Sequence, residues 1–257
     1  MRKQVYTVPV MEAMRVEDEC PFCLLEREAE EHALDFVLGS CSSYMEDDIR
    51  AQTDETGFCR EHLKKMFQYG NALGNSLILE THLRKLSAEL KREMDNFSGG
   101  GKKSLIKYIH KEADVDSDSN NVSGWIRAKE KTCYVCDHVK SNFKHYTSVF
   151  FELVKREDPE FLELLKNGKG VCIHHLADVL DAAPEYLNRK EQEKLREILF
   201  ERMDCNLARI IDELEWFQNK FDYRFADADW KNSKDSVQRA MQKIGGGYPA
   251  DPPYRQK

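Results

Sequence analysis

The 257-residue sequence has no long apolar run, and no stretch of about 18 such residues occurs that could cross a membrane. Its first residues show neither the apolar core nor the small-residue cleavage site of a signal peptide. Basic residues are not in excess, because 46 acidic side chains against 39 basic ones give a net charge of −7. We therefore expect a cytoplasmic protein that binds no membrane and no nucleic acid, since phosphate recognition needs a clustered basic face.

Strand-like alternation of apolar and polar residues is also absent. Apolar residues instead recur every three or four positions, which is the period of an amphipathic helix. One such stripe joins Phe22, Leu25, Ala29, Ala33 and Phe36, and a longer one through residues 195–221 predicts a helix of about 30 residues. With 41% hydrophobic residues the chain can bury a core without disulfides, and we predict an all-α protein.

The sequence does contain a Cys-x2-Cys pair followed by a Cys-x2-His pair, and this pattern occurs twice. The two copies consist of Cys20, Cys23, Cys59 and His62, and of Cys133, Cys136, Cys172 and His175. Every ligand of the second copy lies 113 residues after its counterpart in the first. Two identical spacings of this length indicate two metal sites made by an internal duplication.

The surroundings of the ligands are repeated as well. Gly57-Phe-Cys-Arg-Glu-His-Leu aligns with Gly170-Val-Cys-Ile-His-His-Leu at the same offset. We predict two pseudo-repeated helical halves, residues 10–97 and 124–230, each organised around its own Cys3His site. Turn-forming residues place a linker at 98–123, with a short helix over 104–112, and a tail at 231–257, with a helix over 236–244.

Three thiolates and one imidazole form a tetrahedral set that structural zinc prefers, so we expect two zinc ions per chain. A helix of about 18 residues after Cys23 would rise about 27 Å, and a similar length of returning chain would bring Cys59 back to it. Cys59 and Cys172 follow the turn residues Gly57 and Gly170 and should begin helices, where thiolates are stabilised.

Several other side chains need an assignment. The alignment with His62 selects His175 over His174 as a ligand. His32 and His145 are also equivalent at the offset of 113, and they are candidates for a role beside the ligands or as alternative ligands. The two remaining cysteines, Cys41 and Cys205, are expected to be buried free thiols.

Alternatives to structural zinc stay open. A Cys-x2-Cys pair at a helix start is also found in thiol redox enzymes, and Cys20-Pro-Phe-Cys23 has that form, although the βαβ context is missing. Cysteine ligands can hold an iron–sulfur cluster, for which Cys3His is unusual. A catalytic metal site, with one ligand displaced by water, is a third reading. We identify no catalytic residue, so an enzyme is the less favoured class.

The runs Cys20-Pro-Phe-Cys-Leu-Leu-Glu-Arg-Glu and Gly57-Phe-Cys-Arg-Glu-His-Leu, together with Phe221-Asp-Tyr-Arg-Phe, resemble a family of uncharacterised bacterial proteins. The resemblance covers nearly the whole chain and implies the duplicated Cys/His pattern, with no established reaction. Some members carry an automatic label of ABC transporter substrate-binding protein, for which this sequence shows neither export signal nor lipid anchor. We expect a binding or regulatory module whose partner is a protein, a small molecule or a second copy of the chain.

Overall fold

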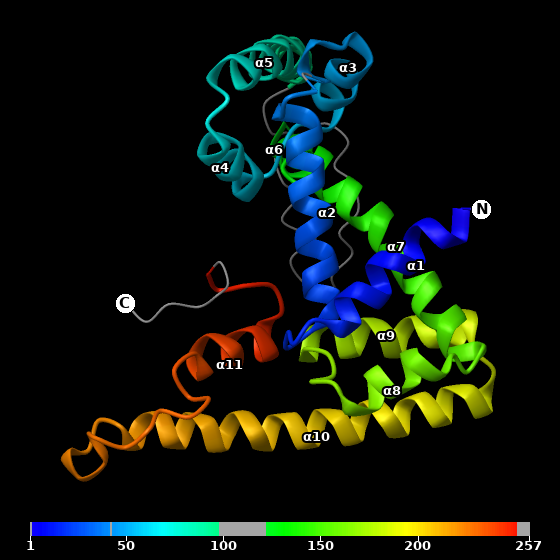
Figure 1. Ribbon diagram of the computed structural model, residues 1–257. Coiled ribbons are helices and arrows are strands. Elements are labelled where there is room, and N and C mark those ends of the chain that lie inside the picture. Colours follow the sequence, from blue (N-terminus) through cyan, green and yellow to red (C-terminus); the bar gives the residue numbers. More distant parts are fainter. Residues whose placement is uncertain (1, 42, 98–121, 251–257) are drawn as a thin grey trace, which may run out of the picture. The chain divides into compact units, whose positions relative to one another are not determined.

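The computed structural model describes residues 2–41, 43–97 and 122–250, and these residues form helices and no strand (Figure 1). The predicted all-α class is therefore confirmed. The helices belong to two compact units: unit 1 is built from the chain up to Ala29 and from Ser141 onward, and unit 2 from Glu30 to Lys140. Among the described helices, none combines the length and apolar character needed to span a membrane.

Unit 1 is centred on aromatic side chains. Its helices are α1 (Arg2–Arg15), the start of α2 (Pro21–Leu38), most of α7 (Tyr134–Lys155), α8 (Pro159–Asn167), α9 (Ile173–Tyr186), α10 (Arg189–Asn219) and α11 (Ser236–Gly245), with a 3-10 turn η3 (Tyr223–Phe225). Phe22, Phe150 and Phe161 are almost fully buried, and neighbouring rings lie 5.2 Å apart. Such ring pairs stabilise a core beyond the area they bury.

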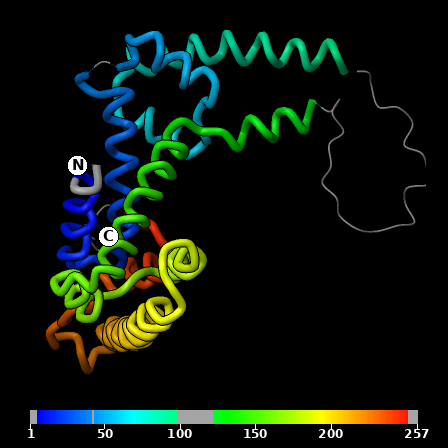
Figure 2. Tube along the Cα trace, turned by 90° about the vertical axis from the view of Figure 1, so that its right-hand side faces the viewer, coloured from blue at the N-terminus to red at the C-terminus, as the bar shows by residue number. Residues whose placement is uncertain are grey.

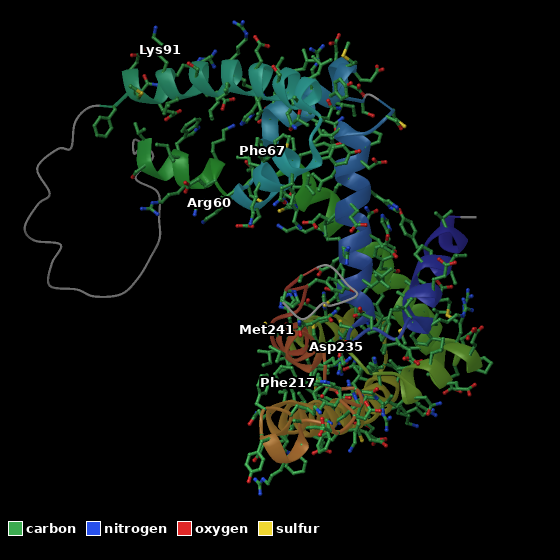
Figure 3. The ribbon with its side chains drawn as sticks, turned by 60° about the vertical axis from the view of Figure 1, so that its left-hand side comes forward. Arg60, Phe67, Lys91, Phe217, Asp235 and Met241 are labelled. Carbon is green, nitrogen blue, oxygen red and sulfur yellow. The ribbon has the colours of Figure 1, made fainter. Side chains whose placement is uncertain are left out.

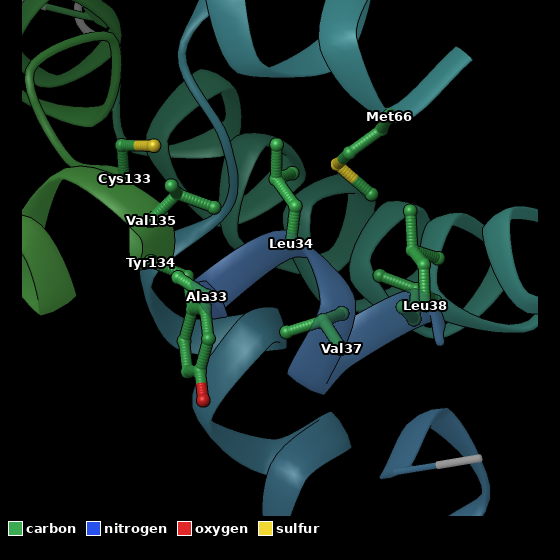
Figure 4. Close-up of a cluster of buried hydrophobic side chains, with 9 residues drawn as sticks. Ala33, Leu34, Val37, Leu38, Met66, Cys133, Tyr134 and Val135 are labelled. Atoms are coloured by element: carbon green, nitrogen blue, oxygen red, sulfur yellow. The ribbon is translucent and has the colours of Figure 1, made fainter. Parts of the chain in front are cut away.

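Unit 2 contains the rest of α2 and the start of α7, with η1 (Ser43–Met45), α3 (Asp47–Thr56), α4 (Arg60–Tyr69), α5 (Ala72–Asp95) and α6 (Val122–Lys129). Its core gathers Leu34, Val37 and Leu38 of α2 with Met66 of α4 and Val135 of α7 (Figure 4). The helices α5 and α6 run side by side (Figure 2), and an ion pair of 2.7 Å joins Glu89 to Lys129.

The element predictions made in the C-terminal part are confirmed. The long stripe is α10, which has 31 residues, and the tail helix is α11. The helix expected over 104–112 lies outside the described residues. The predicted halves, 10–97 and 124–230, are defined by the sequence repeat. The division into compact units does not test that repeat, so the bounds of the halves stay a prediction. The compact units divide the chain elsewhere, inside α2 and inside α7.

Two burial predictions are wrong. Cys41 and Cys205 are free thiols as expected, but both are exposed. Phe36 is 44% exposed, while Leu34 and Val37 beside it are buried. A stripe extrapolated along α2 assumes one set of neighbours, whereas this helix passes from one compact unit into the other.

Helix α11 is amphipathic with its polar side inward. Its buried residues are Ser236, Arg239, Gln242 and Lys243. Met241 and Ile244 are 54% and 65% exposed, and Figure 3 labels Met241 on this helix. An apolar core therefore does not account for the position of α11, since polar contacts hold it to unit 1.

Candidate metal centres

The eight predicted ligands come together in two groups of four. Site A consists of Cys20, Cys23, Cys172 and His175, and site B consists of Cys59, His62, Cys133 and Cys136. Each site thus combines the Cys-x2-Cys of one half with the Cys-x2-His of the other. The predicted pairing, in which each half closes its own site, is wrong. Site A lies entirely in unit 1 and site B entirely in unit 2.

The lengths of the connecting helices explain the exchange. Helix α2 has the expected 18 residues and rises about 27 Å. The returning segment contains only the three-residue η1 and the ten residues of α3, which rise about 15 Å. His62 therefore meets α2 at Glu30, ten residues beyond Cys20, and its group is completed by Cys133 and Cys136.

In site A the imidazole Nδ1 of His175 faces three sulfurs. It lies 3.4 Å from Cys20 Sγ, 3.5 Å from Cys23 Sγ and 3.1 Å from Cys172 Sγ. The Sγ atoms of Cys23 and Cys172 are 3.7 Å apart. All four residues are buried, with exposures of 0–1%. The neighbouring His174 stays outside this set, since its side chain is 60% exposed and lies 3.5 Å from Asp178.

Site B repeats this geometry. The Nδ1 atom of His62 lies 3.2 Å from Cys59 Sγ, 3.2 Å from Cys133 Sγ and 3.4 Å from Cys136 Sγ. The sulfurs of Cys59 and Cys136 are 3.9 Å apart. Cys59 and Cys136 are only half-buried, whereas His62 and Cys133 are buried.

Both groups fit a tetrahedral ion. Zinc with Zn–S bonds of about 2.3 Å and a Zn–N bond of about 2.0 Å would place its sulfurs about 3.8 Å apart and the nitrogen about 3.5 Å from each sulfur. The observed S···S distances of 3.7 and 3.9 Å and N···S distances of 3.1–3.5 Å are close to these values. The donor set and its spacing thus suit one metal ion per site.

The local backbone at the two Cys-x2-His motifs is nearly identical. Cys59 and Cys172 each precede a helix as its N-cap, with φ, ψ of −72°, 166° and −73°, 166°. Gly57 and Gly170 have positive φ values of 61° and 70°, which L-residues with side chains rarely adopt. A methyl group on Gly57 would lie 2.7 Å from the His82 ring. The predicted helix starts are confirmed.

Carboxylates face the outer nitrogen of each histidine, and the sequence patterns did not identify them. Glu30 Oε1 lies 2.8 Å from His62 Nε2, and the other carboxylate oxygen, Oε2, pairs with Lys65. Glu26 Oε2 lies 3.3 Å from His175 Nε2, which makes no well-aligned hydrogen bond within the described part of the chain. A carboxylate at this position fixes the tautomer that leaves Nδ1 free to bind metal. The four-residue spacing of Glu26 and Glu30 on α2 was the available signal.

The equivalent histidines 32 and 145 do not take this role. His32 and His145 are exposed, and His145 stacks on Tyr6 with ring centroids 4.6 Å apart. Neither belongs to a metal-capable group among the residues that the structure describes. The two histidines share the offset of 113 residues because of the sequence repeat. They do not share a contact with the metal ligands in the described part of the chain.

Both sites stabilise thiolate next to positive charge. Burial opposes protonation of His62, but hydrogen bonds with Cys133 and Glu30 outweigh it and raise its pKa to about 10. Burial also opposes ionisation of Cys133, yet the hydrogen bond with His62 helps to lower its pKa to about 6. In site A, contacts with Cys20 and Cys23 depress the pKa of Cys172, and the pKa of His175 rises to about 12 because its thiolate contacts outweigh burial. The hydrogen bond with Cys172 raises the pKa of Cys23, and burial raises the pKa of Cys136 to about 12, so each group favours one thiolate beside a cationic imidazole.

Site A has a cover that site B lacks among the described residues. The segment after α11 crosses its sulfurs, and the backbone N–H of Gly247 donates to Cys23 Sγ over 3.2 Å. A methyl group on Gly246 would lie 3.4 Å from Cys172 Sγ, so the backbone passes close to that ligand. Gly246 and Gly247 have positive φ values of 72° and 63°, a conformation that favours glycine.

Comparison with known proteins adds a family and no reaction. No curated protein and no solved structure matches the chain. A family model described as a family of unknown function matches residues 1–251, nearly the full sequence, including all eight cysteine and histidine residues of sites A and B. The chain belongs to this family of unknown function, DUF6062.

Proposed function

We propose that this is a zinc protein in which sites A and B each hold one structural Zn²⁺, and that the protein acts as a binding or regulatory module. The observation that carries the proposal is the pair of four-residue groups whose sulfur and nitrogen spacings match a tetrahedral ion. Three thiolates and an imidazole favour zinc over magnesium or calcium, which prefer oxygen ligands.

The composition of the groups favours a structural role over a catalytic one. A catalytic zinc site usually has three protein ligands and keeps one position for water or substrate. Here each group offers four protein donors within 4.8 Å of one another. When bound, each zinc ion would cross-link two chain segments, and the surrounding residues would keep those segments in place relative to each other.

A reducing compartment suits this proposal. All eight cysteines are free thiols, including the exposed Cys41 and Cys205. Thiolate ligands and exposed thiols persist where disulfides are kept reduced, as in the cytoplasm. A protein, a small molecule or a second copy of the chain would be the partner of the surfaces that the metal holds in shape.

Metal analysis of the purified full chain tests the zinc sites. We expect close to two zinc per chain, falling to one in Cys172→Ser and to one in Cys59→Ser. The matched control is Cys205→Ser, which removes an exposed thiol outside both sites and should keep two. A folded wild-type protein that holds no metal after purification and binds none when zinc is added would overturn the proposal.

A second candidate is a redox sensor that uses site B. Its support is that Cys59 and Cys136 are half-buried and their sulfurs lie 3.9 Å apart. A peroxide would oxidise one thiolate to a sulfenic acid and be reduced to hydroxide. The second thiolate would then displace hydroxide to form a disulfide, leaving too few ligands for the ion.

The two candidates differ in their response to peroxide. In a Cys41→Ser, Cys205→Ser background, the sensor requires that about one equivalent of hydrogen peroxide release one zinc per chain, with a Cys59–Cys136 disulfide in the peptide map. A thiol reductant and added zinc should then restore the site. Retention of both ions at doses that leave the helical spectrum unchanged would exclude the sensor and leave structural zinc in place.

A further inference from the structure

Two hydrogen bonds in site B join its Cys-x2-Cys segment to the turn before Cys59. The backbone N–H of Tyr134 donates to Gly57 O over 2.9 Å. The Thr132 hydroxyl donates to Thr56 O over 2.6 Å. Because Tyr134 follows Cys133 and Gly57 precedes Cys59 by two residues, these bonds fix the two ligand-bearing segments against each other.

Neither bond can form at the corresponding positions of site A. The offset of 113 residues relates Tyr134 to Pro21 and Thr132 to Glu19. Proline has no backbone N–H to donate. An ionised glutamate only accepts hydrogen bonds, and the Glu19 carboxylate already accepts from Arg209 over 2.6 Å. The acceptors that correspond to Gly57 and Thr56, which are Gly170 and Lys169, therefore need another partner.

The ammonium group of Lys243 lies at this place. Lys243 is 1% exposed, and its Nζ donates to Glu19 O over 2.6 Å and to Lys169 O over 2.7 Å. A third, longer contact of 3.4 Å reaches Val171 O. Glu19 and Val171 directly precede the ligands Cys20 and Cys172, so one side chain connects the two ligand-bearing segments of site A.

We propose that Lys243 is a positioning residue of metal site A, in which it donates to Lys169 O, the counterpart of Thr56 O in site B, and to Glu19 O, and that α11 is therefore an integral part of this site. The inference rests on the proposed zinc function. A charged donor has a second effect here, because three thiolates and one divalent ion carry a net charge of about −1. The buried ammonium group of Lys243, whose pKa burial lowers and which also lies 3.4 Å from Glu19 Oε2, would offset part of that charge.

The remaining contacts of α11 agree with this role. Gln242 donates to Asp18 Oδ1 over 2.7 Å, and the same oxygen accepts the backbone N–H of Cys20 over 2.9 Å. One residue past the C-cap of α11, the N–H of Gly247 reaches Cys23 Sγ. The polar face of α11 is thus turned inward because its partners are the polar groups around the ligands.

Zinc competition on full-length variants tests the proposal. In a Cys136→Ser background, which leaves site A alone, Lys243→Met should weaken zinc binding by about 10- to 100-fold, as is typical for groups that position ligands. In a Cys172→Ser background, which leaves site B, the same change should have no effect. The matched control is Lys194→Met, which removes a lysine on the surface of unit 1, where it pairs with Glu157 over 2.9 Å.

The outcomes separate this proposal from the zinc function itself. Wild-type protein that binds no zinc would refute the function. Two bound zinc ions together with unchanged site A affinity in Lys243→Met would refute only the role of Lys243. Equal weakening of both sites would also refute it, because that result indicates general destabilisation and no local role.

A measurement on the wild-type chain covers the case in which Lys243→Met does not fold. Hydrogen exchange of the α11 amides should be slow with zinc and at least about 10-fold faster after site A is stripped, because metal and α11 then stabilise each other. The α10 amides near Leu199, in the core of unit 1, serve as the internal reference. Equal exchange of α11 with and without metal would overturn the proposal.

Discussion

Sites A and B share a ligand plan and differ in what surrounds it. Both present an imidazole Nδ1 to three sulfurs, and both begin their Cys-x2-His helix at an N-cap cysteine with the same backbone angles. Site A is buried and has Lys243 and Gly247 beside its ligands. Two cysteines of site B are half-buried. A duplicated ligand set can thus acquire different accessibility through a few neighbouring residues.

The difference can be traced to two positions. Where site B has Thr132 and Tyr134, which supply donors from residues adjacent to Cys133, site A has Glu19 and Pro21, which cannot supply the same bonds. Site A depends instead on Lys243, a side chain of the C-terminal helix α11 that lies 224 residues after Glu19 and 74 residues after Lys169. We infer that, among the described residues, site B is held by donors next to its own ligands and is partly exposed, and that site A is closed and depends on the C-terminal helix.

Loss of a metal ligand should destabilise the protein more than any other change considered, and the loss of stability should be larger at site A than at site B. Cys172→Ser should lower the free energy of unfolding by about 5 kcal/mol or more, because structural zinc binds with an apparent 10–16 kcal/mol and the site is in the core of unit 1. Cys136→Ser should cost less, since this residue is half-buried. Urea unfolding in the presence of zinc measures the free energy of unfolding of both variants. An equal decrease in the two variants would contradict the proposed difference between sites A and B.

Chelation kinetics should separate the two ions in the unmodified chain. A chromophoric chelator should remove one zinc per chain at least about 10-fold faster than the other, because two cysteines of site B are only half-buried, whereas site A is buried and covered. The fast phase should disappear in Cys136→Ser and the slow phase in Cys172→Ser. Release of both zinc ions from the wild type in a single kinetic phase would contradict the difference in accessibility between sites A and B.

The carboxylates beside the histidines sharpen the comparison further. Glu30→Gln should weaken zinc binding at site B by about 10-fold, because Glu30 accepts a well-formed bond of 2.8 Å from His62. Glu26→Gln should change site A by less than about threefold, because Glu26 lies 3.3 Å from a His175 nitrogen that makes no aligned bond. Competition titrations of each variant against wild type would detect a reversal of this order.

The smallest predicted effect concerns the donor unique to site B. Thr132→Val removes the hydroxyl bound to Thr56 O and should cost about 1 kcal/mol, which is about fivefold in site B affinity. Thr147→Val is the matched control, because the buried Thr147 hydroxyl has no hydrogen-bond partner among the residues that the structure describes. If Thr147→Val weakens zinc binding as much as Thr132→Val does, the Thr132 hydroxyl has no specific role in site B.

Sequence patterns identified much of this architecture but not the partnership of the ligands. Helical periodicity predicts α10 and α11, and the turn glycines 57 and 170 predict the helix starts at Cys59 and Cys172. Spacing alone assigns Cys59 to Cys20, because the closest sequence neighbours are the simplest partners. The real pairing depends on the unequal lengths of α2 and α3, which set where the returning chain meets α2.

The same sequence patterns could not predict contacts between segments that are far apart in the chain. Lys243 is an ordinary helix residue in sequence, and its role follows only from the carbonyl groups of Glu19 and Lys169 that surround it. Exposure of Cys41 and Cys205 likewise depends on which helix faces are covered, a property of packing that composition does not report.

Anomalous diffraction at the zinc edge tests the central claim most directly. Crystals of the zinc-loaded full chain should show two peaks, one about 2.3 Å from the sulfurs of Cys20, Cys23 and Cys172, and one at the same distance from those of Cys59, Cys133 and Cys136. Absence of both peaks would contradict the metal sites. A peak shared by Cys20, Cys23 and Cys59 would contradict the exchanged pairing on which the account of sites A and B depends.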